Sequence, residues 1–80
     1  MKSLESATDA IDYAATTAVD LIAAGGGPCR AIMPRASGNL VIITVRTGAT
    51  RTIAVTQDVL EPIQATNITV ANAIACRVYW

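Results

Sequence analysis

The sequence predicts a mainly β fold: a small antiparallel β-barrel or sandwich of five to six short strands, preceded by an N-terminal arm that is partly helical. Two observations carry this prediction. Short runs of β-branched residues, separated by Gly, Pro and Asn, recur throughout the second half of the chain, and a helical period is confined to its beginning. We therefore divide the chain into an arm at residues 1–24, a Gly-Pro hinge at 25–28 and a β-domain at 29–80.

The N-terminal segment is amphipathic when it is read with the period of a helix. Its apolar residues fall on one face: Leu4, Ala7, Ile11, Ala15, Ala18 and Ile22. The acidic residues Glu5, Asp9, Asp12 and Asp20 fall on the opposite face. This spacing predicts a helix over about residues 3–14. From Tyr13 to Leu21 the β-branched residues lower the helix propensity, so an extended arm remains an alternative there.

The first half of the β-domain gives the clearest signal in the chain. After Gly25–Gly27 and Pro28, a short strand is expected from Cys29 to Met33, and Pro34 ends it. Residues 40–45 and 51–55 then read as two strands of a β-hairpin, joined by a polar turn that contains Gly48. Because residues 40–43 leave no polar face, we expect this strand to be covered on both sides.

The second half predicts three further short segments. Pro62 has no amide hydrogen for a ladder, so its strand should lie at an edge or begin at Pro62. Residues 67–70 form another short strand. In the last segment, 74–80, Ile74, Cys76, Val78 and Trp80 point to one side. The terminal pair Tyr79–Trp80 should be docked, either on the chain's own core or on a neighbouring copy.

Composition favours association with other chains. Hydrophobic residues make up 52% of the 80-residue chain and charged residues only 15%, well below the usual share of roughly 25%. Small domains have thin stability margins, and oligomerisation is a common remedy. The charge is also divided unevenly, with a net −3 over residues 1–25 and +3 over residues 26–80. Opposite parts can attract within one chain or between copies, or remain ordinary solvated charge.

The residues offer little chemistry. The chain has no His, which removes the usual general base and the commonest metal ligand, so we expect no enzyme activity, no cofactor and no metal. Cys29 and Cys76 form no CxxC motif, and we interpret them as two buried thiols. Five scattered arginines without stacking aromatics do not predict nucleic-acid binding. No run is long enough for a membrane helix, and no signal peptide is visible.

From about residue 16 onward, four-fifths of the chain resembles the small head-decoration and spike-base proteins of tailed bacteriophages and phage-derived gene transfer agents. The resemblance is carried in order by these segments: Thr16 to Leu21, Pro28-Cys29-Arg30-Ala31-Ile32, Gly38-Asn39-Leu40-Val41-Ile42, Arg51 to Thr56, Leu60-Glu61-Pro62-Ile63 and Ile74 to Trp80. It implies a compact β-barrel or sandwich that self-assembles on a phage capsid, and an extended segment from Tyr13 to Leu21.

The resulting hypothesis is a virion structural protein, assembled in the bacterial cytoplasm, that decorates or cements the capsid as a trimer or pentamer. Its partners would be further copies, the major capsid protein and a head spike or fibre for which it forms the base, with no nucleic acid and no membrane. The expected interface residues are Leu4, Ile11, Val19, Ile22, Pro62, Tyr79 and Trp80. Two alternatives remain: a tail or neck connector, and a small cellular β-module that binds a peptide or ligand.

Overall fold

The computed structural model describes residues 9–69 and 72–80, and β-strands dominate them, as predicted. Seven strands and one short helix follow one another along this part of the chain. In chain order they are β1 (Ala10–Tyr13), β2 (Val19–Asp20), α1 (Leu21–Gly25), β3 (Ala31–Pro34), β4 (Gly38–Thr44), β5 (Thr50–Val55), β6 (Ala65–Ile68) and β7 (Cys76–Tyr79).

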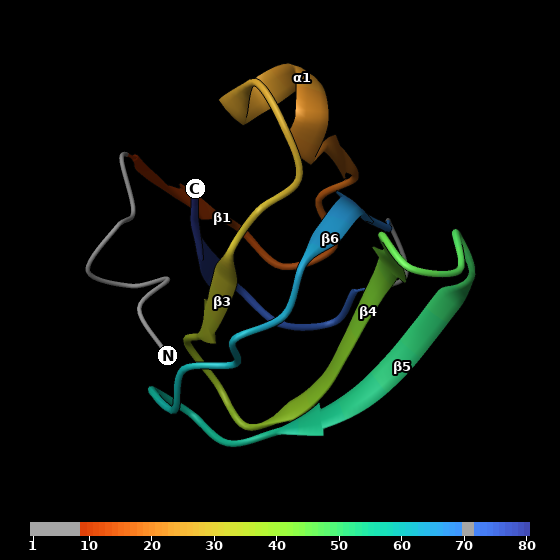
Figure 1. Ribbon diagram of the computed structural model, residues 1–80. Coiled ribbons are helices and arrows are strands. Elements are labelled where there is room, and N and C mark those ends of the chain that lie inside the picture. Colours follow the sequence, from red (N-terminus) through yellow and green to blue (C-terminus); the bar gives the residue numbers. More distant parts are fainter. Residues whose placement is uncertain (1–8, 70–71) are drawn as a thin grey trace.

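The strands form two antiparallel sheets that share one core (Figure 1). The first sheet has the order β1-β7-β3, and the second has the order β2-β6-β4-β5. Among the described residues the sheets do not close into a barrel, so the barrel alternative is wrong. Fully buried side chains from both sheets meet in the core, for example Ile32 and Val78 from the first and Leu40 and Ile42 from the second.

The predicted hairpin is confirmed as β4 and β5. Its register pairs Ile43 with Thr50 next to the turn and Gly38 with Val55 at the far end. Leu40 and Ile42 are fully buried, whereas Val41 and Ile43 on the other face are half-buried. The strand therefore has one face in the core and a second face that is only partly covered.

The predicted helix over residues 3–14 is wrong where the structure describes it. Residues 10–13 form β1, which pairs with β7 and matches Ile11 with Val78. Exposure alternates along β1, with Ile11 and Tyr13 half-buried and Ala10 and Asp12 exposed. This stretch is therefore compatible with a period of two as well as with a helix. A short isolated helix is marginal in water, and pairing with the core strand β7 outweighs local propensity.

The following segment is partly extended and ends in a helix that the sequence analysis did not predict. A turn at Ala15–Thr16 leads to β2, and α1 begins at Leu21. Asp20 caps α1, because its carboxylate accepts hydrogen bonds from the backbone N–H groups of Ile22 (3.1 Å) and Ala23 (3.2 Å). Gly26 ends the helix in the left-handed conformation at φ +82°.

The remaining predictions are confirmed in part. The strand expected at residues 29–33 is β3, which begins two residues later. The strand expected near residues 67–70 is β6, displaced toward the N-terminus, and Val70 lies outside the described residues. The strand expected around Pro62 does not form. Only an isolated bridge joins Glu61 to Ile32 there, and Pro62 itself is exposed.

Candidate functional site

Trp80 is docked in the chain's own core, whereas Tyr79, the other residue of the terminal aromatic pair, is half-buried. The Trp80 side chain is only 4% exposed. The indole N–H donates to two backbone carbonyls, those of Leu21 at 3.1 Å and Gly27 at 3.0 Å. The backbone N–H of Trp80 donates to the Asp9 carbonyl at 2.9 Å, which extends the ladder between β1 and β7. The last residue of the sequence is therefore part of the structural core.

The glycine run that the sequence analysis read as a hinge lies against this tryptophan. A Cβ atom placed on Gly25 would collide with the Trp80 indole ring, while one placed on Gly27 would meet nothing within 4 Å. Gly25 is thus needed for the close approach of the α1 end to the ring. The local signal showed that the chain turns here, but not which side chain packs against the turn.

The other expected interface residues fall into two groups. Ile11, Val19 and Tyr79 are half-buried, and the first two pack against the core. Ile22 is 45% exposed and Pro62 is exposed. Leu4 lies outside the described residues. Of the six expected residues that the structure describes, Ile22 and Pro62 are therefore the two that are exposed rather than half-buried or buried.

Two further exposed hydrophobic residues were not singled out from the sequence. Val45 follows β4 and is 40% exposed, and Val59 follows β5 and is 50% exposed. Val45 stands beside the predicted turn that contains Gly48, and Val59 follows the predicted strand at residues 51–55. A β-branched apolar residue next to or beyond a strand end was the signal that could have identified them. Together with Ile22, they are the most accessible large hydrophobic side chains of the described residues.

A shallow groove of about 470 Å³ lies beside the β4–β5 turn. Residues 44–47 and Arg51 form one wall, and residues 62–64 form the other. Val45, Pro62 and Ile63 give the groove an apolar part, and Arg46 and Arg51 give it positive charge. It is the place where two of the exposed hydrophobic residues, Val45 and Pro62, come together.

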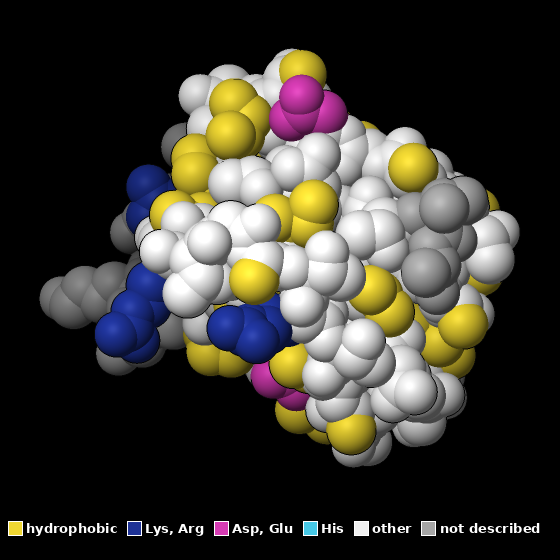
Figure 2. All heavy atoms as spheres, turned by 90° about the vertical axis from the view of Figure 1, so that its right-hand side faces the viewer, with side chains coloured by type: hydrophobic (Ala, Val, Ile, Leu, Met, Phe, Trp, Pro, Cys, Tyr) yellow, Lys and Arg dark blue, Asp and Glu magenta, His cyan; other side chains and the backbone are white. Residues whose placement is uncertain are grey.

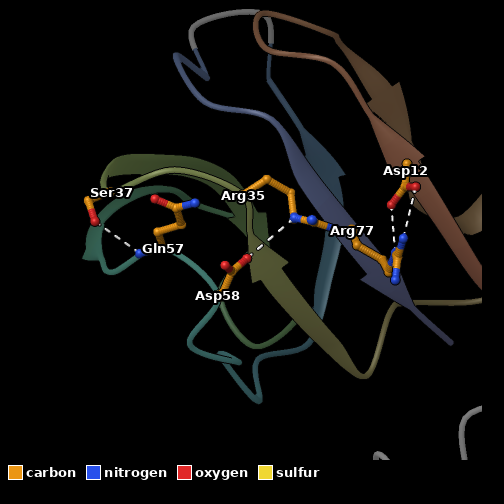
Figure 3. A network of polar contacts seen from close by, with 6 residues as sticks. All are labelled: Asp12, Arg35, Ser37, Gln57, Asp58 and Arg77. Atoms are coloured by element: carbon orange, nitrogen blue, oxygen red, sulfur yellow. Dashed lines mark hydrogen bonds and ion pairs between the residues drawn. The ribbon is translucent and has the colours of Figure 1, made fainter.

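Exposed polar contacts join neighbouring strands of the first sheet and the segments that follow β3 and β5 (Figure 3). Arg77 on β7 donates to both carboxylate oxygens of Asp12 on β1, at 2.7 Å and 3.1 Å. This hydrogen-bonded pair lowers the pKa of the Asp12 carboxyl and raises that of the Arg77 guanidinium. The acidic and basic parts of the sequence thus attract within one chain. A looser pair joins Arg35 to Asp58 at 3.4 Å.

The two cysteines are free and buried, as interpreted from the sequence. The Cys29 thiol donates to the Ile63 carbonyl at 3.4 Å and its sulfur accepts from the Ala65 N–H at 3.3 Å. Burial raises the pKa of both thiols, that of Cys76 to about 11. Within residues 9–69 and 72–80, no group of three or more His, Cys, Asp or Glu side chains is arranged to hold a metal ion.

Comparison with known proteins identifies no relative: no family model, no curated protein and no solved structure matches this chain. Across the described residues, no helix has the length and apolar character needed to cross a membrane.

Proposed function

We propose that this protein is a virion structural protein that associates with further copies of itself and decorates or cements a phage capsid. The proposal rests on the sequence resemblance and on the character of the surface. The ring would be a trimer or pentamer, with the major capsid protein as its principal partner and a spike or fibre as a further one.

The observation that supports this proposal best is the exposure of apolar side chains on a chain that has little charge. The chain is 52% hydrophobic, yet the buried core of the described residues contains 13 hydrophobic residues. Ile22, Val45 and Val59 are 40–50% exposed. Accessible apolar side chains on a chain with few charges are compatible with a surface that partner chains cover, and the proposal assigns these three side chains to that surface.

The direct test is binding of the purified full-length chain to capsid shells of the phage that encodes it. Cosedimentation should show saturable binding with a fixed number of copies per shell. Imaging of the decorated particles should show the density at threefold or fivefold positions of the head. Protein that stays in the supernatant at every concentration would contradict the proposal, and sixfold density on the tail or neck would favour the connector alternative.

The contribution of the exposed residues is tested with point variants, because a large N-terminal deletion would damage the fold. Residues 10–20 supply strands to both sheets, and Leu21 is fully buried. Ile22→Ser should weaken shell binding by about tenfold or more, as loss of an apolar contact does. As a control, Asn39→Ser changes an exposed polar residue and should leave shell binding unchanged. Equal binding by both variants would remove Ile22 from the interface.

One observation favours the second candidate, a β-module that binds a peptide. The groove beside the β4–β5 turn joins an apolar part to Arg46 and Arg51, which suits an extended peptide with an acidic residue. Titration of the protein with short acidic peptides, followed by amide chemical shifts, tests this candidate. Shifts confined to residues 44–51 and 62–64 would support it, and an unchanged spectrum would exclude it.

A further inference from the structure

The two sheets end in four edge strands, and three of these have limited room for another strand. The outer side of β3 is occupied by the Glu61 bridge, in which Ile32 and Glu61 exchange two backbone hydrogen bonds of 2.9 Å and 2.8 Å. In β1 the Ala10 N–H is already taken by the Asp9 carboxylate at 2.8 Å. β2 is only two residues long.

The fourth edge strand, β5, is long and open. It has six residues, and in the described part of the chain its one strand neighbour is β4. It lies on the outer side of the sheet in Figure 1. Natural edge strands are commonly protected by Lys, Pro or a bulge. β5 contains no Lys or Pro and one charged residue, Arg51, and its pairing with β4 runs without a register shift from residue 50 to residue 55.

The register shows which backbone groups of β5 are free. The N–H and C=O of Val41 are both used on the β6 side of β4, by the Asn72 side chain at 3.0 Å and the Thr69 N–H at 3.3 Å. The adjacent residues Leu40 and Ile42 therefore bond toward β5, where they pair with Ile53 and Arg51. It follows that the N–H and C=O groups of Thr50, Thr52 and Ala54 point away from β4.

The free N–H and C=O groups of one β5 can form hydrogen bonds with the same groups of a second, antiparallel β5. We propose that a second copy of this chain adds its own β5 antiparallel to this edge, with a twofold axis at Thr52. Thr52 then pairs with Thr52 of the second copy, and Thr50 pairs with Ala54 at both ends. Each of these pairs exchanges two backbone hydrogen bonds, and the two four-stranded sheets become one continuous sheet.

The side chains fit the same arrangement. In this register Arg51 lies opposite Ile53 of the second copy, so no two like charges stand directly opposite each other. Because the two strands are antiparallel, the N-terminal end of one β5, which contains Arg51, lies beside the C-terminal end of the other, which leads to Asp58. Figure 2, which looks onto the right-hand side of Figure 1, shows mostly backbone and uncharged side chains, with the basic groups toward one side.

The test uses Thr52→Pro, which removes the central outward N–H. Because this N–H does not face β4, the β4–β5 ladder should remain and the variant should fold. The matched control, Thr52→Val, keeps the N–H and the β-branched shape. At micromolar concentrations, sedimentation equilibrium should give twice the 8.3 kDa chain mass, or an even multiple of it, for the wild type and Thr52→Val. Thr52→Pro should halve that mass.

Two results would overturn the proposal: a monomeric wild type, or a folded Thr52→Pro variant whose mass is unchanged. If circular dichroism shows that Thr52→Pro is unfolded, the proposal is tested instead by amide hydrogen exchange of the wild type. The amides of Thr50, Thr52 and Ala54 should become protected as the concentration rises, while those of Arg51 and Ile53 are protected throughout. Equal exchange at all concentrations would refute the edge contact. The twofold contact joins copies in pairs and is distinct from the threefold or fivefold contacts of the proposed ring, and no shell is used, so this inference and the capsid proposal can fail separately.

Discussion

At the scale of single residues, the contact between Trp80 and Gly25 organises one end of the molecule. The ring fills the space beside α1, and its N–H is shared by two carbonyls from the segment that holds Gly25. A buried tryptophan usually finds a partner for its N–H, and here the partners come from residues more than fifty positions away. This contact joins the C-terminal strand to the helix and the glycine run.

A methyl group at Gly25 should therefore be costly, whereas the same group at Gly27 should not be. Gly25→Ala forces the Trp80 ring to move, and we expect the free energy of unfolding to fall by about 1–3 kcal/mol. Gly27→Ala should stay within about 0.5 kcal/mol of the wild type, because its Cβ meets open space. Urea denaturation followed by the fluorescence of the single tryptophan measures both. A similar loss in both variants would contradict the packing role of Gly25.

The same residues show what sequence patterns can and cannot predict. The alternation predicted that Ile74, Cys76, Val78 and Trp80 point to one side, and in the structure each of them is at most 7% exposed. The role of Gly25 was not predictable, because a glycine run gives the same local signal for a free hinge and for a turn that receives a ring. Only the tertiary contact distinguishes the two.

At the scale of elements, Asn72 links the two sheets. Its side-chain oxygen accepts from the Val41 N–H in β4 at 3.0 Å, and its side-chain nitrogen donates to the Ile74 carbonyl, just before β7, at 2.6 Å. The side chain is 1% exposed, so water cannot replace these bonds. The sequence pattern predicted no role for this amide.

Asn72→Ala should leave a buried N–H and a buried carbonyl without partners. We expect the free energy of unfolding to fall by about 2–4 kcal/mol. Asn39→Ala, at an exposed position of β4, should change it by less than about 0.5 kcal/mol. Chemical denaturation monitored by circular dichroism measures both variants. Equal stability of the Asn72→Ala variant and the wild type would show that the link between the sheets is dispensable.

The Asp12–Arg77 pair should make the attachment of β1 to β7 sensitive to acid. The Asp12 pKa is lowered in the folded state, so its contribution to stability is present above the ordinary carboxyl pKa, near 4. That contribution is lost as the pH falls through the folded-state value. Asp12→Asn and Arg77→Gln should both flatten the decrease in urea midpoint between about pH 5 and pH 3. An unchanged slope in both variants would refute the role of this pair.

Elements with a single consistent signal were predictable, and ambiguous ones were not. The β4–β5 hairpin combines β-branched strands with a glycine turn, and every local preference agrees with the fold. Residues 10–13 fit a helix by spacing and a strand by alternation. Pairing with the edge of β7 favours the strand, and β7 lies more than sixty residues away in the sequence. The bounds of β3 and β6 shifted for the same reason, since the neighbouring strands set them.

At the scale of the whole molecule, valine residues have two roles, one in the buried core and one at the exposed surface. Val55 is 7% exposed and belongs to the core, whereas Val59, four residues later, is 50% exposed. Stability of the single chain depends on the first. Under the proposed function, association with other chains depends on the second. The sequence alone did not distinguish them, because both are valines at or just beyond the end of the predicted strand at residues 51–55.

The same substitution should therefore lower the stability of the single chain at Val55 and weaken its association with other chains at Val59. Val55→Ser should lower the free energy of unfolding by about 2 kcal/mol, because it removes buried methyl groups and leaves a hydroxyl in an apolar site. Val59→Ser should change it by less than about 0.5 kcal/mol and still weaken association, measured by light scattering and by cosedimentation with capsid shells. If Val59→Ser associates as strongly as the wild type, its exposed side chain is ordinary surface, and the interface must be sought at Ile22, Val45 and the edge of β5. If Val59→Ser and the corresponding serine variants of Ile22 and Val45 all lose association while they keep the fold, these exposed apolar residues act together, as expected for a protein that works within a larger assembly.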